Sequence, residues 1–274
     1  MTTSQNEIVA AGTAALNVVP AAPPEPLAAV SATGLSKVFG QGGNTVHALD
    51  RLDLQVRAGE FVCLVGASGC GKSTLLNLVS GLDEPTSGSV KVDGRTGLMF
   101  QESALFPWLT VAGNVELALR LSPDNKMRKS ARRQRADALL KSVHLDGFAD
   151  RRPHELSGGM RQRVALARAF AQDADVLLMD EPFGALDAMT RDLLHDELER
   201  LWVDRSFTVL FVTHNVREAA RLADRIVLLS SRPGRVVAEF PVDIDRPRRI
   251  DSPEVSTLAR TITDRLREEV RRHA

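Results

Sequence analysis

The stretch at residues 66–74, which reads GASGCGKST, limits the possible folds of this chain more than any other part of the sequence. It fits the phosphate-loop pattern G-x-x-x-x-G-K-[ST]. The apolar run at 61–65 is typical of a buried parallel strand, and residues 74–79 have the composition of a helix that packs on a sheet. The glycines let backbone N–H groups approach phosphate oxygens, and the helix N-terminus adds partial positive charge. We expect a nucleotide here, with Lys72 reaching its β- and γ-phosphates and the Ser73 hydroxyl on Mg²⁺.

Composition narrows the class of protein further. The 274 residues carry 35 Lys and Arg and 35 Asp and Glu, so no overall field attracts nucleic acid. No apolar run approaches the length of a membrane helix, and the N-terminus lacks the pattern of a signal peptide. We therefore expect a protein that is neither exported nor membrane-spanning by itself.

The chain has only two cysteines, Cys63 and Cys70. They fit neither a disulfide framework nor a metal site, which favours a reducing cytoplasm. Cys70 lies inside the phosphate loop near a helix N-terminus. It is either a thiol sensitive to alkylation or, as the simpler interpretation, a small residue that fits the turn.

The order of segments predicts one large domain over 27–240 between two less regular ends. Residues 1–26 are rich in Ala, Thr, Val and Pro, which predicts a disordered tail. Short alternating segments before the phosphate loop, at 30–39, 46–49 and 52–56, predict an antiparallel β layer. Residues 107–168 are mostly helical by pattern, with a break near 122–125, and we interpret them as an inserted α-helical subdomain.

A basic cluster opens one helix of that insertion. It is either a solvated helix face or a contact for phospholipid head groups or an acidic partner. Its members are Lys126, Arg128, Lys129, Arg132, Arg133 and Arg135.

Strands and helices alternate after the insertion. Apolar runs at 176–179, 208–212 and 226–229 are separated by helical stretches, which predicts a mostly parallel sheet covered on both faces. Residues 235–239 predict an edge strand, and 241–274 a linker and a charged helix. The predicted fold class is α/β, a P-loop NTPase core with an N-terminal antiparallel β layer and an inserted α-helical subdomain.

Polar residues follow two of the apolar runs, at the sheet edge where ligands of parallel sheets bind. Asp180 and Glu181 alone are equally compatible with an ordinary cap or turn. Beside a phosphate loop, however, we expect Asp180 to hold Mg²⁺ through water and Glu181 to orient or deprotonate the attacking water. His214 is placed to donate a hydrogen bond to the γ-phosphate. The remaining histidines are assigned structural roles: His47, His144, His154, His195 and His273.

A second anion site is predicted where Ser157, Gly158 and Gly159 open a helix. A simple capped turn explains the same residues. Yet one nucleotide needs one phosphate cradle, so a second cradle suggests that two copies of the chain share each nucleotide.

Together these motifs resemble the ATP-binding subunit of an ABC transporter. They occur in the family's order over about residues 29–240. The motifs are the Walker A loop at 66–74, the glutamine Gln101, the LSGGM signature at 156–160, the Walker B run at 176–181, the D-loop at 185–187 and the switch His214.

The resemblance implies roles that the pattern alone does not give. Ser157 and Gly159 would contact the γ-phosphate bound to the opposite subunit, and Gln101 would link the metal site to a transmembrane partner. Phe39 lies where the family places an aromatic ring on adenine, and Val46 is assigned to the same nucleotide site. The family often has Tyr at the first of these positions, whereas this chain has none, so ring stacking is retained and any hydroxyl contact is lost.

Residues 100–110 and 153–157 are similar to the nitrate, sulfonate and taurine importer group. The chain also ends too soon after its last sheet run for the regulatory domain of sugar or methionine importers. The resemblance implies a peripheral ATPase on the cytoplasmic face of the membrane, dimerised head to tail around two Mg·ATP. Its other partners would be an integral membrane permease and, indirectly, an extracytoplasmic substrate-binding protein, with no nucleic acid.

The alternative is a soluble, non-transport ABC-type ATPase of DNA repair, cluster assembly or translation. The segment from Gln101 to Ser157 is too short for the coiled coil of DNA-repair versions, and a single Walker A loop disfavours the two-domain translation versions. A nucleotide-gated regulator without turnover is disfavoured because Glu181 and His214 are both present.

The predicted site residues fall into three groups. Glu181, His214, Lys72 and Gln101 serve hydrolysis, and Ser73, Gln101 and Asp180 hold Mg²⁺. The predicted ATP contacts are Phe39, Val46, Gly66, Ser68, Gly69, Cys70, Gly71, Lys72, Ser73, Thr74, Ser157, Gly158, Gly159 and Asp187.

Overall fold

The structure, a computed structural model, describes residues 28–40, 44–122 and 127–273. The predicted disordered tail at 1–26 and Lys126 of the basic cluster lie outside these residues. No helix within the described ranges is long and apolar enough to cross a bilayer.

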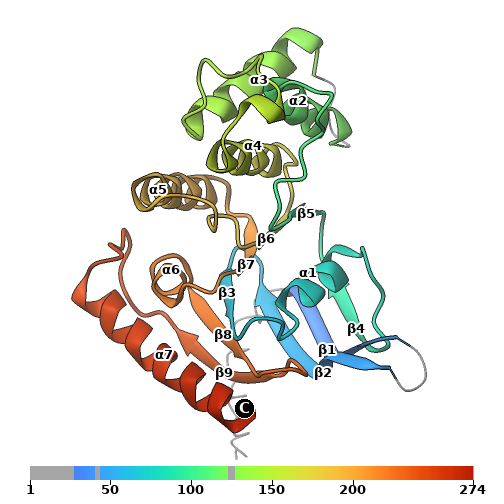
Figure 1. The fold of residues 1–274 in the computed structure, drawn as a ribbon, viewed down its shortest axis with the longest axis vertical. Helices are drawn as coiled ribbons and strands as arrows, with labels where there is room; N and C mark the ends of the chain where they lie inside the picture. Colours follow the sequence, from blue (N-terminus) through green and yellow to red (C-terminus); the bar gives the residue numbers. More distant parts are fainter. Residues whose placement is uncertain (1–27, 41–43, 123–126, 274) are drawn as a thin grey trace, which may run out of the picture.

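A six-stranded sheet forms the centre of the molecule, with strand order β5-β6-β7-β3-β8-β9 (Figure 1). Five strands are parallel and the edge strand β9 is antiparallel, which confirms the expected mostly parallel sheet. Every residue of β3, β6 and β7 is buried, because helices or a second sheet cover both faces. The bounds are β3 (Phe61–Val65), β5 (Thr96–Met99), β6 (Val176–Asp180), β7 (Thr208–Val212), β8 (Arg225–Leu229) and β9 (Val236–Pro241).

A three-stranded antiparallel sheet, in the order β2-β1-β4, packs beside the first. It consists of β1 (Ala28–Phe39), β2 (Val46–Arg57) and β4 (Ser87–Val92), and it confirms the predicted antiparallel layer. The two segments predicted at 46–49 and 52–56 form one strand. The chain does not break between them, because Arg51 takes a left-handed φ of 44° and the register with β1 shifts there.

Alternate residues of β3 belong to two different cores. Val62 and Leu64 pack with the antiparallel sheet and with α1 (Lys72–Ser80). Phe61 and Cys63 pack into the other core, toward the remaining helices. The sheet therefore lies between two apolar layers. Successive side chains of a strand point to opposite faces, so a continuous apolar strand needs an apolar layer on each face.

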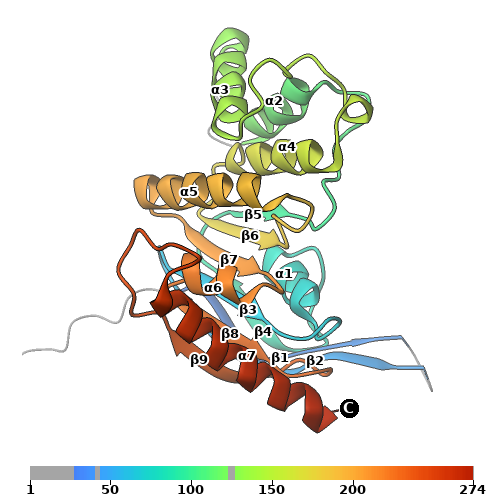
Figure 2. The same cartoon turned by 60° about the vertical axis from the view of Figure 1, so that its left-hand side comes forward.

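Three helices gather at one end of the molecule: α2 (Val111–Leu121), α3 (Lys129–Ser142) and α4 (Gly158–Phe170) (Figures 1 and 2). In both views α5 (Ala188–Arg205) lies between this group and the sheet. A short helix, α6 (Val216–Leu222), follows β7, and a 3-10 turn, η1 (Pro153–Glu155), precedes α4.

The last helix, α7 (Pro253–His273), runs along the side of the molecule remote from α2 and α3 (Figure 2). Its predicted apolar stripe packs against the core at Leu258, Ile262 and Leu266. The fourth member, Val270, is 40% exposed, so the stripe docks over most of its length but not at its end.

Candidate nucleotide-binding site

Most of the predicted site residues line one cavity of about 480 Å³. It lies at the edge where β3, β6 and β7 end, because parallel strands bring their carboxyl ends to the same side of a sheet. The predicted residues that line it are Phe39, Val46, Gly66, Ser68, Gly69, Gly71, Lys72, Ser73, Thr74, Gln101, Asp180, Glu181 and His214.

The phosphate loop needs glycine most clearly at Gly71. This residue has φ 102°, and a Cβ there would lie 2.7 Å from the backbone oxygen of Ala48. Gly71 is also the N-cap of α1, and no side chain caps that helix. The first N–H groups of α1 are therefore directed at the cavity without a capping side chain, as an anion site requires.

Lys72 is only 7% exposed, and its ammonium group lies inside the loop. Its Nζ donates to the carbonyl oxygens of Gly66 and Ala67, both at 2.9 Å, and lies 3.6 Å from the Cys70 sulfur. These partners are all neutral. A buried cation held by neutral groups keeps its attraction for a phosphate anion.

Asp180 ends β6 and is 8% exposed. Burial raises the pKa of its carboxyl group above the ordinary value; the Ser73 hydroxyl bond opposes this rise, and the negative charge of Glu181 adds to it. A divalent cation would favour the charged carboxylate. Ser73 and Asp180 offer adjacent oxygen ligands and Gln101 lines the same cavity, so the residues present fit Mg²⁺, which takes few protein oxygens together with phosphate and water.

Glu181 and His214 face each other across the ends of two neighbouring strands. Oε2 of Glu181 lies 3.0 Å from Nδ1 of His214. The Glu181 amide donates to the Val212 carbonyl at 3.0 Å, which ties its turn to β7. Glu181 itself has a left-handed φ of 46°, so the chain leaves β6 in a sharp turn.

The structure does not bring the signature residues Ser157, Gly158 and Gly159 into this cavity, nor Asp187. Ser157 is exposed and caps α4, its hydroxyl accepting from the Met160 amide at 3.2 Å. Asp187 caps α5 in the same way, and its hydrogen bond from the Thr190 amide lowers the pKa of its carboxyl group. A Cβ on Gly159 would lie 3.3 Å from Leu186, so the signature and the D-loop are neighbours.

Cys70 does not line the cavity either, and it is 1% exposed. A thiol buried beneath the loop is poorly accessible to an alkylating reagent. The structure thus favours the interpretation of Cys70 as a small residue that fits the turn.

Two lining residues escaped the sequence prediction, Ala48 and Arg232. Arg232 lies in the turn between β8 and β9, and its Nε donates to the Gly69 carbonyl at 3.1 Å. Arg232 and Gly69 are 163 positions apart in the chain, and no motif surrounds the arginine. Only the pairing of β8 with β3 brings them together.

The basic cluster at the start of α3 is partly neutralised within the chain. Arg133 hydrogen-bonds to Asp137 and to Asp150, both at 3.1 Å. Arg133 is therefore less available to an outside anion than the sequence suggested.

The chain is similar to known proteins over most of its length. The ABC transporter family model matches residues 49–184. An uncharacterised ABC transporter ATP-binding protein of Methanocaldococcus jannaschii is 45% identical, over 86% of this chain and 90% of its own. The aliphatic sulfonates import ATP-binding protein of Bacillus licheniformis is 42% identical, over 82% of this chain and 89% of its own. The nitrate import ATP-binding protein of Synechocystis sp. is 46% identical, over 77% of this chain and 82% of its own.

A solved structure provides a comparison in three dimensions. It is an ATP-binding cassette in a dimeric, post-hydrolysis state bound to ADP and Pi. It is 35% identical to this chain, superposes with a TM-score of 0.74, and covers 79% of this chain and 100% of its own. The chain therefore belongs to the ATP-binding subunits of ABC transporters and is an ABC-type ATPase.

Proposed function

We propose that this ATPase powers the uptake of a small anion through a membrane permease. The observation that carries the proposal is the division of the predicted site. One cavity gathers the Walker A and Walker B residues and His214, whereas Ser157 lies exposed outside it. A single chain then supplies half of each nucleotide site.

In this proposal two copies join head to tail, and Ser157 of one copy closes the phosphate site of the other. The dimeric state of the solved relative supports this arrangement. Ser157 lies exposed at the N-terminus of α4, where its hydroxyl and the positive end of the helix dipole suit a second set of phosphate contacts. Closure on ATP and reopening after hydrolysis would then move whatever is attached to each subunit.

Within one site each side chain has a distinct task. Lys72 and the amides of the loop hold the phosphates, and Glu181 orients the attacking water and accepts its proton. His214, now bonded to Glu181, turns its ring toward the γ-phosphate when that group is present. Mg²⁺ held by Ser73 and Asp180 would supply positive charge to the phosphates. Gln101 reports the state of this site to the partner surface.

The variant Glu181→Gln tests the assignment of the general base. It should bind ATP, accumulate as a closed dimer in size-exclusion chromatography, and hydrolyse at least about 100-fold more slowly, the usual contribution of such a base. Glu254→Gln on the exposed first turn of α7 is the matched control and should hydrolyse at the wild-type rate. Unchanged turnover in Glu181→Gln would refute the role.

A groove of about 850 Å³ beside the Gln101 loop supports the permease partner. Its apolar members include Phe100, which is 43% exposed, and Leu121, which is 71% exposed. Exposed apolar side chains along a hollow are typical of a surface that receives an apolar segment of another protein. We propose that a cytoplasmic segment of the permease occupies it, which holds the subunit at the cytoplasmic face of the membrane.

Substitution within the groove tests that partner. Leu121→Glu should abolish co-purification with the permease while leaving ATP binding unchanged. Leu82→Glu, at a residue 62% exposed and outside the groove, is the matched control and should retain the permease. An active ATPase from which no integral membrane protein is ever captured would favour the non-transport alternative.

The cargo class comes from the names of relatives and from the sequence motifs. Relatives named for aliphatic sulfonates and for nitrate have similar identities to this chain, so identity does not separate the two cargoes. Both are small anions, and we propose an anion of the sulfonate, nitrate or taurine class delivered by an extracytoplasmic binding protein. ATPase stimulation of the reconstituted transporter by each loaded binding protein would identify the cargo.

A further inference from the structure

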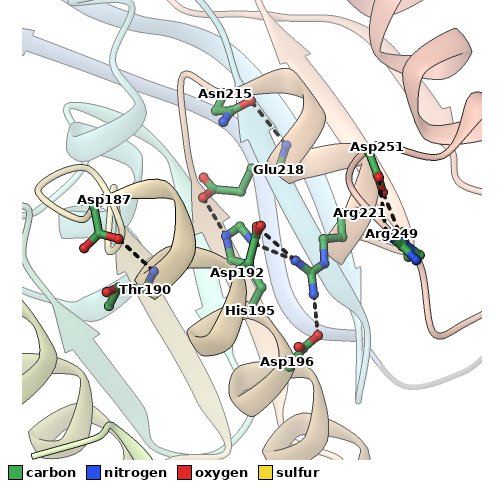
Figure 3. A network of polar contacts seen from close by, with 10 residues as sticks. All are labelled: Asp187, Thr190, Asp192, His195, Asp196, Asn215, Glu218, Arg221, Arg249 and Asp251. Atoms are coloured by element: carbon green, nitrogen blue, oxygen red, sulfur yellow. Dashed lines mark hydrogen bonds and ion pairs between the residues drawn. The ribbon is translucent and has the colours of Figure 1, made fainter.

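A buried polar network joins α5 to α6 outside the nucleotide cavity (Figure 3). Its centre is His195, which is fully buried, and its neighbours Glu218 and Arg221 are 4% and 5% exposed. Nε2 of His195 lies 2.8 Å from Oε1 of Glu218, and Nδ1 lies 3.1 Å from a terminal nitrogen of Arg221. Arg221 also contacts two carboxylates of α5, Asp192 and Asp196.

This geometry determines which nitrogen of His195 carries hydrogen. The Arg221 guanidinium has only donors, so Nδ1 must accept its hydrogen bond. Nε2 then carries the hydrogen and donates it to the Glu218 carboxylate. His195 is thus a neutral ring that joins a buried anion to a buried cation.

His195 contacts the segments that carry both proposed catalytic groups. Its ring packs edge-on against Phe183, with centroids 4.8 Å apart, and Phe183 lies in the turn that follows Glu181. Its hydrogen-bond partner Glu218 lies in the first turn of α6, directly after the segment that contains His214. That first turn is fixed by Asn215, whose side chain accepts from the amide of Arg217. It also accepts from the amide of Glu218 (Figure 3).

These contacts and the Glu181–His214 hydrogen bond form a closed ring of neighbouring residues. Glu181 leads through Phe183 to His195, and His195 leads through Glu218 and Asn215 back to His214. His195 also lies on the helix that starts at the D-loop residue Asp187. One buried side chain therefore holds three motif segments at fixed separations.

We propose that His195 is a positioning residue for ATP hydrolysis, which sets the separation of Glu181 and His214. The proposal rests on the catalytic roles assigned above to those two residues. Misplacing a catalytic group by about 1 Å can cost up to about 100-fold in rate, so a side chain that fixes this separation affects turnover without touching the nucleotide. Its effect should fall on kcat and not on the KM for ATP.

Two substitutions at position 195 separate positioning from packing. His195→Leu fills the space but offers neither donor nor acceptor, and should lower kcat about tenfold with KM changed less than twofold. His195→Gln keeps one donor and one acceptor, and should retain kcat within about twofold of wild type. Both are measured as steady-state ATPase of the full chain, below the melting temperature of each variant. Arg200→Leu, on the exposed side of α5, is the control and should leave kcat unchanged.

A double-mutant cycle tests whether His195 acts through His214. In a His214→Ala background, under single-turnover conditions, His195→Leu should change the hydrolysis rate less than twofold, because without His214 there is no Glu181–His214 separation left to set. Arg221→Met removes the hydrogen bond to Nδ1 of His195, so the ring is no longer held in one tautomer, and kcat should fall in the wild-type background. This variant replaces His195→Leu in the test if His195→Leu does not fold.

Three results would overturn the proposal. They are a wild-type kcat in folded His195→Leu, equal impairment of the Leu and Gln variants, or the full effect of His195→Leu in the His214→Ala background. If Glu181→Gln hydrolyses normally, the proposed function fails first. If Glu181→Gln is inactive and His195→Leu is normal, only this inference fails.

Discussion

The parallel strands of the six-stranded sheet end at a carboxyl edge and begin at an amino edge, and charged side chains have different partners at the two. At the carboxyl edge, Lys72 bonds to neutral acceptors and the buried carboxyl of Asp180 has a raised pKa. At the amino edge, Arg225 is bonded to Glu60 at 2.8 Å and to Glu239 at 2.6 Å.

The pKa directions repeat this contrast. Burial alone would raise the pKa of Glu60, but hydrogen bonds from Arg225 and from the Arg57 amide outweigh it and hold the pKa below its ordinary value. The charges at the amino edge satisfy one another, whereas Lys72 and Asp180 at the carboxyl edge form no ion pair among the described residues. Charge pairing thus distinguishes the edge that stabilises the fold from the edge that binds.

Removing the lysine of the binding edge should give the largest effect. Lys72→Ala should weaken ATP binding by about 100-fold, because two or more charge-assisted hydrogen bonds to phosphate are lost. Its melting temperature should stay close to that of wild type. Calorimetric titration with ATP checks this, with Lys91→Ala on an exposed strand position as control. Equal affinities of Lys72→Ala and Lys91→Ala for ATP would contradict the proposed difference between the two edges.

Removing the arginine of the other edge should give the reverse pattern. Arg225→Met leaves Glu60 largely buried without its ion-pair partner, and should lower the free energy of unfolding by about 3 kcal/mol while kcat per folded molecule stays the same. Denaturant unfolding measures the first quantity and steady-state ATPase the second. Arg249→Met breaks an exposed pair with Asp251 and should cost less than about 0.5 kcal/mol.

The amino edge should also make the fold sensitive to acid. Because the pKa of Glu60 is lower in the folded chain, its stabilisation is complete above the ordinary value of 4.5 and is lost as pH falls toward the folded pKa. The denaturant midpoint of wild type should therefore fall more steeply below pH 4.5 than that of Glu60→Gln. If the denaturant midpoints of the two proteins fall equally steeply below pH 4.5, the assigned pKa direction is wrong.

The smallest effect is expected at the missed cavity residue. Arg232→Ala should weaken nucleotide binding about threefold, since one exposed hydrogen bond that steadies the loop at Gly69 is lost. Arg235→Ala, which breaks an exposed pair with Asp50 outside the cavity, is the control and should bind normally. A tenfold loss in Arg232→Ala would indicate direct contact with the nucleotide.

Local patterns in the sequence predicted the sheet well. The apolar runs at 176–179 and 208–212 coincide with β6 and β7 to within a residue, because strands buried on both faces read as continuous apolar segments. The polar residues after them could be placed at one edge for the same reason. Most of the cavity was therefore predictable from residues adjacent to strand ends.

What the sequence could not predict depends on contacts between distant segments. Arg232 reaches Gly69 only through the pairing of β8 with β3. The network around His195 could not be predicted, because its partners Glu218 and Arg221 lie on another helix and carry no motif. The proposed contact of Ser157 with the nucleotide involves a second copy, so it could not be tested within one chain.

The left-handed backbone of Glu181 has a consequence for how this chain can be stabilised. At φ 46° a non-glycine residue raises the free energy of the folded backbone by about 1 kcal/mol relative to glycine, because its Cβ crowds the following carbonyl group. Glycine at position 181 would relax the turn and remove the carboxylate at once. If Glu181 is the general base, as proposed, selection for thermal resistance and selection for turnover favour different residues at this single position.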